Sequence, residues 1–401
     1  MRIGAIITEF NPFHNGHSLI ANEARQTFGS DCVIAIMGTY FAQRGGPYIY
    51  SPNIRSKMAV TCGYDLVLGL PYCYSAQGAE VFCRGAVNYA SSLPCDFLLF
   101  GSELGHIETF KKIGGIIAHE PAGFIKQLRE NLDAGQSFAT SRARSLEAMT
   151  GMDMEFLSQS NNILAVEYCK AKESLESNIE LFTIKRDKDM ASAGYIRSID
   201  ALFGENKWFD YAKHYIPGQI HCLAAKEPRR NCNEYTNLAK YKLLIDGLGA
   251  LENIAEIEDG LDHLIISKLD GLDLGIDKLA VDVSNKRYTV ARAHRIIFNS
   301  LMGYTSQDLS FFKHNFPSRI QLLAYNDKGR EALRFLKKMG GIEIMPNTFK
   351  KKGQLSMADE RMLDFEEKAR NLYMIFQNQG DSTNRQYFEK FIPELPLEVK
   401  S

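Results

Sequence analysis

The sequence has no pair of cysteines at CxxC spacing, no apolar run long enough to cross a membrane, and almost no net charge. Its eight cysteines are scattered, and although His221, Cys222 and Cys232 lie close together, no second ligand pair follows at zinc-site spacing. We therefore expect reduced, mostly buried thiols and no metal site. The formal net charge of −1 excludes a global attraction to nucleic acid or to an anionic membrane, so any basic surface must be local.

The first residues also lack the features of a secretory signal, because the segment from Met1 to Glu9 soon becomes polar. No apolar stretch approaches the roughly 20 residues that a membrane helix requires. We therefore expect a cytoplasmic protein. With 401 residues, of which 45% are hydrophobic and 24% charged, the chain can form two or three domains with a sizeable core.

The N-terminal half alternates short apolar runs with helical patterns, which is typical of a parallel sheet with right-handed crossovers. The expected strands are residues 3–7, 32–37, 65–68, 96–100 and 180–184. The expected helices are residues 16–28, 53–63, 76–91 and 195–203, with a mainly helical stretch over 104–175. The prediction is an α/β fold with a Rossmann-like core over residues 1–215.

The composition changes beyond that point. Residues 251–283 contain nine acidic residues against two lysines, whereas residues 284–352 contain fourteen Lys and Arg against four acidic residues. Helical periodicity dominates there, so residues 216–401 are expected to form a second, mainly α-helical domain with one basic face. A solvated helix face balanced by the acidic block is the simpler interpretation of the charges alone.

The loop after the first strand carries the strongest chemical signal. It runs Asn11-Pro12-Phe13 and then His14-Asn15-Gly16-His17, where a helix begins. The first turn of such a helix offers free N–H groups and a positive dipole end to a phosphate, and the glycine allows a close approach. His14 and His17, three residues apart, would flank that space and stabilise the charge on a departing pyrophosphate. Alternatively, the two histidines merely cap the helix or pack against it.

Two further segments suit the same crevice. Gly101-Ser102-Glu103 follows an expected strand and would contact adenosine, unless it is only a turn or a helix cap. Ser192-Ala193-Gly194-Tyr195-Ile196-Arg197 would offer N–H groups and a cation to phosphates, unless it is an ordinary helix start with a surface arginine.

These residues resemble a known family. His14 to His17 with Ser192 to Arg197 is similar to the paired HxGH and SSTxIR signatures of the HIGH-motif nucleotidyltransferases. More narrowly, the chain resembles the bacterial tRNA(Met) cytidine acetate ligase family over nearly its whole length. The matching stretches, in chain order, are Glu9 to His17, Gln43-Arg44-Gly45, Asp65-Leu66-Val67, Phe100 to Glu103, Asn161 to Leu164, Ile184-Lys185-Arg186, Lys286-Arg287-Tyr288-Thr289, Ala291-Arg292 and Arg295.

The resemblance implies a two-step reaction. Acetate and ATP give acetyl-adenylate and pyrophosphate, and the acetyl group passes to the exocyclic amine of the wobble cytidine of elongator tRNA(Met). It implies ATP as a substrate. Magnesium is expected because nucleoside triphosphates are normally handled as its complex, and no tightly bound cofactor is predicted. The expected catalytic residues are His14 and His17. The expected ATP contacts are Ile7, Thr8, Glu9, Phe10, Asn11, Pro12, Phe13, Asn15, Gly16, Ile20, Gly101, Ser102, Glu103, Asn161, Asn162, Lys185, Arg186, Ser192 and Arg197. From the residues alone, the asparagine pair also reads as a helix N-cap, and Lys185-Arg186 as a solvated charge pair.

The expected tRNA contacts are Arg44, Arg55, Lys286, Arg287, Arg292 and Arg295. Arg319, Lys337 and Lys338 extend this basic set, and Tyr288, Phe311, Phe312 and Tyr325 are candidates for stacking on exposed bases.

Two positions depart from the family pattern. Pro52 stands where the family has a lysine, which would remove one cation, and Gly194 stands where it has threonine, which would remove one hydroxyl. Two other functions therefore remain open: a small-molecule adenylyltransferase of coenzyme biosynthesis, and a degenerate relative that only binds nucleotide or RNA.

Overall fold

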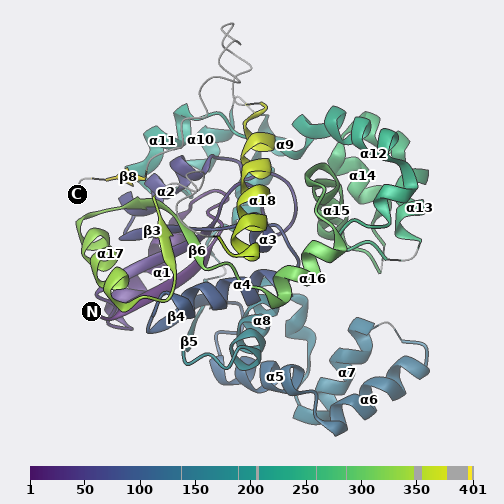
Figure 1. The fold of residues 1–401 in the computed structure, drawn as a ribbon, viewed down its shortest axis with the longest axis horizontal. Helices are drawn as coiled ribbons and strands as arrows, with labels where there is room; N and C mark the ends of the chain where they lie inside the picture. Colours follow the sequence, from purple (N-terminus) through teal and green to yellow (C-terminus); the bar gives the residue numbers. More distant parts are fainter. Residues whose placement is uncertain are drawn as a thin grey trace, which may run out of the picture.

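At the centre of the computed structural model is an eight-stranded, mostly parallel sheet (Figure 1). The structure describes residues 1–136, 138–187, 189–204, 207–258, 260–285, 287–346, 355–376 and 396–399. The strands are Ile3–Thr8 (β1), Cys32–Gly38 (β2), Leu66–Leu70 (β3), Phe97–Ser102 (β4), Glu180–Lys185 (β5), Arg319–Tyr325 (β6), Glu343–Met345 (β7) and Leu397–Glu398 (β8). They lie in the order β5–β4–β1–β2–β3–β6–β7, and β8 pairs with β6.

The direction of winding reverses at β1. This strand pairs in parallel with β2 on one side and with β4 on the other, and β4 pairs in parallel with β5. The carboxyl ends of β1, β4 and β5 therefore meet at one edge of the sheet, with Ser102 opposite Lys185 in register. In open α/β sheets this switch point is where ligands bind.

Both faces of the sheet are covered, and β2 shows this most clearly. All seven of its residues are buried. Cys32, Ile34 and Ile36 belong to one hydrophobic cluster, whereas Val33, Ala35 and Met37 belong to the other. A strand whose alternate residues enter two cores reads in the sequence as one continuous apolar run.

Helices from both halves of the chain cover the sheet. Those contributing buried residues to the cluster of Val33 are Asn15–Gln26 (α1), Pro52–Thr61 (α2), Ala193–Phe203 (α9), Trp208–Ala212 (α10) and His221–Lys226 (α11). Those contributing to the cluster of Cys32 include Tyr72–Ser75 (α3), Ala79–Ser92 (α4), Ser160–Ser174 (α8), Asp327–Met339 (α17) and Met357–Met374 (α18).

Two groups of helices extend from this body (Figure 1). The first consists of Ile107–His119 (α5), Ala122–Asp133 (α6) and Phe138–Thr150 (α7), and it leads back through α8 to β5. The second, here called the helical lobe, consists of Thr236–Leu251 (α12), Leu261–Ser267 (α13), Ile276–Val283 (α14), Val290–Met302 (α15) and Ser306–His314 (α16). Within the described ranges, no helix is long and apolar enough to cross a membrane.

The α/β fold class is confirmed, and each strand expected in the first half is present. Three strands were not expected from the sequence. The second half supplies β6, β7 and β8, and β6 runs antiparallel to β3. Residues 216–401 therefore contribute to the sheet as well as to helices, and the boundary at residue 215 remains a prediction. In addition, β4 continues through Gly101 and Ser102 instead of ending at the glycine.

Candidate active site

The loop from β1 to α1 is closed by two histidines that cap the same helix. Nδ1 of His14 accepts a hydrogen bond from the backbone N–H of Gly16 at 3.1 Å, and Nδ1 of His17 accepts one from the N–H of His14 at 3.1 Å. These two bonds form a capping box, which fixes the entry of the chain into α1. The helix-capping and phosphate-site interpretations are therefore compatible, because capping uses only one nitrogen of each ring.

The capping bonds determine where each imidazole carries its proton. A backbone N–H can only donate, so both Nδ1 atoms are unprotonated and the proton of each neutral ring is on Nε2. Burial, and next the charge of Arg186, lowers the pKa of His14 to about 4. Burial, then His14 and Arg186, also lowers the pKa of His17. Near neutral pH the two rings are uncharged, and each has an Nε2–H that bonds to none of the described residues.

A cluster of buried aromatic side chains supports His17. Its ring centroid lies 5.0 Å from that of Phe10 and 5.3 Å from that of Phe13, and Phe10 also packs edge-on against Tyr64 at 5.2 Å. Phe10, with φ +46°, occupies a backbone region that bulky side chains rarely adopt. The rigid packing around this residue fixes the position of the His17 ring.

Three of the residues expected to contact ATP have side chains that are buried inside the protein. Phe10 and Phe13 are fully buried, and Ile20 belongs to the same hydrophobic cluster. These side chains hold the loop and the helix in place and cannot touch a nucleotide. Ile7 likewise packs against the other cluster.

The other loop residues expected to contact ATP differ in burial and in hydrogen bonding. Asn11 accepts a hydrogen bond from the N–H of Ile49 through its side chain, and Pro12 is buried. Asn15 is exposed. Thr8, at the carboxyl end of β1, is 6% exposed, and its hydroxyl forms no hydrogen bond with any described residue. A buried hydroxyl without a partner at this edge is suited to a ligand.

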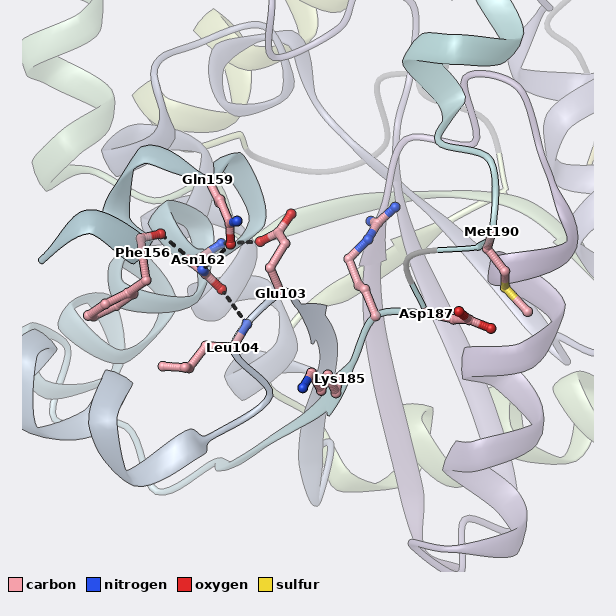
Figure 2. A pocket seen from close by; sticks show the side chains of 9 residues that line it. Glu103, Leu104, Phe156, Gln159, Asn162, Lys185, Asp187 and Met190 are labelled. Carbon is pink, nitrogen blue, oxygen red and sulfur yellow. Dashed lines mark hydrogen bonds between the residues drawn. The ribbon is translucent and has the colours of Figure 1, made fainter. Parts of the chain in front are cut away.

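A pocket of about 470 Å³ opens at the carboxyl ends of β4 and β5. In Figure 2, Gln159, Asn162 and Glu103 lie on one side of it, and Asp187 and Met190 on the other. The lining residues are Glu103, Leu104, Phe156, Gln159, Asn162, Lys185, Arg186, Asp187 and Met190. Its volume is within the range of small-molecule sites.

One wall of the pocket is a hydrogen-bonded network around Glu103. Its carboxylate accepts bonds from the side chain of Asn161 at 2.6 Å and from the N–H of Asn162 at 3.0 Å, in the first turn of α8. The Asn162 side chain in turn accepts from the N–H of Leu104 at 3.0 Å and donates to the carbonyl of Phe156 and the side chain of Gln159. The cap of α8 is thus Glu103 and not the asparagine pair itself.

Ser102 is a correction to the expected ATP contacts. It is fully buried, and its hydroxyl pairs with Thr183 at 2.7 Å and accepts the N–H of Gly105 at 3.0 Å. With both bonds made inside the protein, its side chain closes the turn after β4 and does not reach the pocket.

Arg186 links the pocket to the histidine loop. A Cβ added to Gly101 would lie 3.2 Å from Cγ of Arg186, so the glycine lets this side chain cross the end of β4. The guanidinium forms no hydrogen bond or ion pair with the described residues, and its charge lowers the pKa of both histidines. Met190 approaches from the same segment, since its sulfur lies 3.8 Å from the Cβ position of Gly16. The side chain of Lys185, at the end of β5, is exposed.

The expected phosphate turn also meets the histidine loop. Ser192 accepts the N–H of Tyr195 at 3.1 Å, which caps the start of α9. One turn later, Arg197 donates to the carbonyl of Asn11 at 2.5 Å. Burial lowers the pKa of Arg197. Arg197 is therefore not a free surface arginine, and it connects the second motif to the first. A Cβ added to Gly194 would lie 3.6 Å from Oγ of Ser192 and 3.9 Å from a guanidinium nitrogen of Arg197, which is ordinary van der Waals contact.

Arg55 was expected to contact tRNA, and this is wrong. It is fully buried, and its guanidinium donates to the backbone carbonyls of Tyr50, Glu9, Gly38 and Thr39. It thereby connects the loop after β1 to the loop after β2. The guanidinium also stacks on Tyr48, with 3.9 Å from Cζ of Arg55 to the ring centroid, although the sequence alone did not identify this tyrosine.

Tyr48 and Gln43 hold the Glu9 carboxylate. The hydroxyl of Tyr48 donates to it at 3.2 Å and the N–H of Gln43 at 2.8 Å. Pro52, which replaces the lysine of the family, is in the first turn of α2. Proline is favourable there because the backbone N–H at this position would have no partner within the helix.

Three of the six basic residues expected to contact tRNA are bonded within the helical lobe. Arg295 forms a two-point ion pair with Glu256 at 2.6 Å, and its side chain is 10% exposed. Arg292 binds the carbonyl of Glu256 and pairs with Glu258 at 2.7 Å. Arg287 is exposed and also pairs with Glu258. These residues join the acidic and basic blocks to each other, but Arg295 is enclosed and does not lie on the solvated helix face that the charges alone suggested.

The other expected contacts differ in exposure. Arg44 is exposed and forms no hydrogen bond or ion pair among the described residues, whereas Lys286 lies outside them. Arg319 is buried and pairs with Glu343, while Lys337 and Lys338 are exposed at the end of α17.

The aromatic side chains proposed for base stacking are largely unavailable. Phe312 is fully buried, Tyr288 is 7% exposed, and Phe311 packs against Phe312 with ring centroids 5.3 Å apart. Tyr325 is half-buried and lies near Arg330.

The chain is similar to known proteins over nearly its whole length. The model of a family described as HIGH nucleotidyl transferase matches residues 1–387. A tRNA(Met) cytidine acetate ligase of Clostridium perfringens is 32% identical, with 96% of this chain and 98% of that protein covered. One of Clostridium botulinum is 31% identical, with 97% of each covered. A crystal structure of Thermotoga maritima TmcAL bound with alpha-thio ATP has a TM-score of 0.89 and 25% identity over the whole of both chains.

Proposed function

Because this chain belongs to the HIGH nucleotidyl transferase family, we propose that it is an ATP-dependent tRNA(Met) cytidine acetate ligase. It activates acetate as acetyl-adenylate and transfers the acetyl group to the exocyclic amine of the wobble cytidine of elongator tRNA(Met). The observation that carries this proposal is the pair of neutral histidines next to Arg186, a residue that lines an open pocket. The relatives with that ligase name, matched over nearly their full length, supply the substrates.

ATP binding follows from how the charges and donors are arranged. The adenosine enters the pocket between Glu103 and Met190, and the phosphates extend toward Gly16 and the first turn of α1. Arg186 bridges the two regions, and with no internal partner its guanidinium is free to bind phosphate oxygens in two-point fashion. ATP is handled as its magnesium complex. The carboxylates of Glu9 and Glu103 are already hydrogen-bonded, so the phosphates and water supply the ion's ligands.

The chemical step uses electrostatic stabilisation. A carboxylate oxygen of acetate attacks the α-phosphorus, the bond from this phosphorus to the α,β-bridging oxygen breaks, and negative charge accumulates on the departing pyrophosphate. Nε2–H donors of His14 and His17, fixed in place by their capping bonds, meet that charge without reorganising. Because both rings are neutral, they donate hydrogen bonds to pyrophosphate but bind it less tightly than a charged imidazolium would.

The second step needs a tRNA surface near this site. Arg44 is the exposed, unpaired member of the expected set, and it lies close enough to lower the pKa of Arg197. It therefore stands where an anticodon phosphate would approach the acetyl-adenylate. A tRNA substrate also places the protein in the cytoplasm.

The decisive experiment is exchange of labelled pyrophosphate into ATP by the purified protein. Acetate should stimulate the exchange in the absence of tRNA, because adenylation precedes transfer. Exchange that depends on a mononucleotide instead of acetate would indicate a small-molecule adenylyltransferase. ATP binding without exchange, for any small carboxylate, would indicate a relative that only binds nucleotide.

A further inference from the structure

A cysteine, an aspartate and a histidine converge at the junction of the helical lobe with the loop after β2. Cys232 begins a short 3₁₀ helix (Cys232–Tyr235), Asp277 lies in the first turn of α14, and His294 lies in α15. One ligand atom of each lies within 4.8 Å of the other two. They are separated by tens of residues in the sequence, so no spacing rule identifies them.

The three side chains of this cluster lie close enough to interact with one another. Nε2 of His294 lies 3.0 Å from Oδ1 of Asp277, yet it is buried and makes no hydrogen bond of acceptable geometry. Nε2 of His294 and Oδ1 of Asp277 are thus in contact without a hydrogen bond between them. Two atoms that bind the same metal ion have this arrangement, because the lone pair of each is directed at the ion. A tetrahedral ion holds such atoms about 3.2–3.8 Å apart, given bonds of about 2.0–2.3 Å. Nε2 of His294 and Oδ1 of Asp277 are already close to that separation, and any pair near the 4.8 Å limit would have to move closer together.

We propose that Cys232, Asp277 and His294 form a zinc site. Sulfur, imidazole and carboxylate together favour Zn²⁺, whereas Mg²⁺ and Ca²⁺ take oxygen ligands only. The thiol of Cys232 loses its proton on binding, and water takes the fourth position on the side of Asp277, whose side chain is 55% exposed.

The position of the cluster gives the ion a role. The turn from Ala42 to Gly46 packs directly on it: a Cβ on Gly45 would lie 2.6 Å from Cβ of His294, and one on Gly46 would collide with the sulfur of Cys232. Both glycines also have φ values of +81° and +87°, which favour glycine. Zinc would therefore anchor the helical lobe to the turn that presents Arg44.

Metal content tests the site without reference to activity, so its failure is distinct from failure of the proposed ligase reaction. After equilibration with zinc sulfate and dialysis against a weak chelator, the wild-type protein should retain about one zinc per chain by elemental mass spectrometry. Cys232→Ser and Asp277→Asn should retain less than about a tenth of that, whereas Cys222→Ser, at an exposed cysteine outside the cluster, should match the wild type.

Cobalt substitution provides the second readout. Co²⁺ added to metal-free wild-type protein should give a thiolate-to-cobalt charge-transfer band, which Cys222→Ser retains and Cys232→Ser loses. Wild-type protein that retains less than about a tenth of an equivalent of zinc would overturn the proposal whether or not the variants fold. Equal zinc in Cys232→Ser and wild type would also overturn it.

Discussion

The rings of His14 and His17 lie against each other with centroids 3.8 Å apart, and each ring accepts a backbone N–H of the segment that the two residues enclose. The same two bonds begin α1 and fix the protons of both imidazoles on Nε2. A cap of asparagine or serine would begin the helix equally well. Neither of these side chains would add a second N–H donor on a rigid ring, as Nε2–H of histidine does.

Replacing His17 by alanine should separate catalysis from binding. The change removes one donor to the departing pyrophosphate, so acetate-dependent exchange should fall by about 10²–10³-fold, as when one donor of an oxyanion hole is lost. ATP affinity, measured by calorimetry, should change much less. His119→Ala, at an exposed histidine on α5, is the matched control and should leave both quantities unchanged. A parallel loss of affinity and rate in His17→Ala would contradict the catalytic role.

Arg186→Ala should weaken ATP binding itself. The guanidinium has no internal partner, so its removal leaves no buried charge behind and should not destabilise the fold. Loss of a charge-assisted contact to phosphate should raise the KM for ATP by about ten- to a hundredfold. Arg186→Lys should recover only part of this, because an ammonium cannot make the two-point contact. Arg129→Ala, at an exposed arginine of α6, is the control, and an unchanged KM in Arg186→Ala would refute the assignment.

Arg55 and Arg44 should give opposite phenotypes. Arg55→Met leaves four backbone carbonyls without their donor in a buried site, so it should lower the free energy of unfolding by about 3–5 kcal/mol. Arg44→Ala should change stability by less than about 0.5 kcal/mol. It should instead weaken tRNA binding and reduce the salt dependence of that binding by about one charge. Urea denaturation and filter binding at several salt concentrations measure the two effects.

The stability of the protein should depend on pH through Glu366. This carboxyl is 2% exposed on α18, and burial raises its pKa to about 7, although the N–H of Tyr72 and the hydroxyl of Thr39 donate to it. The folded state therefore keeps a proton that the unfolded state releases above about pH 4.5. Stability should fall as pH rises from about 4.5 to 7, by on the order of 3 kcal/mol from this group, and then level off.

Glu366→Gln tests this dependence, since it keeps the acceptor oxygen and removes the titration. Denaturation midpoints compared between the variant and the wild type across that pH range should converge at low pH and separate near pH 7. A constant difference would show that Glu366 does not titrate with the fold.

Local patterns in the sequence predicted the part of the site that local structure builds. A buried strand, a short polar loop and a helix-starting glycine are all encoded between Ile3 and His17, and the structure reproduces them. Glu103 likewise follows an expected strand, and it lines the pocket, whereas Asn162 was expected at the site only through the family resemblance.

Burial and pairing across the chain could not be read from the sequence. Arg55 has the same appearance in a sequence as Arg44, and only packing shows that one is enclosed and the other exposed. Arg295 finds its partner Glu256 39 residues away. The strand β6 joins β3 across about 250 residues, and a seven-residue run has no periodicity strong enough to distinguish it from the helical segments around it.

The central claim is best tested on the product. Purified protein incubated with ATP, isotope-labelled acetate and elongator tRNA(Met) should place the label on the wobble cytidine, as detected by mass analysis of nuclease-digested tRNA. Omitting ATP or acetate should abolish the labelled nucleoside, and His17→Ala should lower its initial rate of formation by about 10²–10³-fold. Bound but unlabelled tRNA, under conditions where ATP and acetate are saturating, would contradict the account.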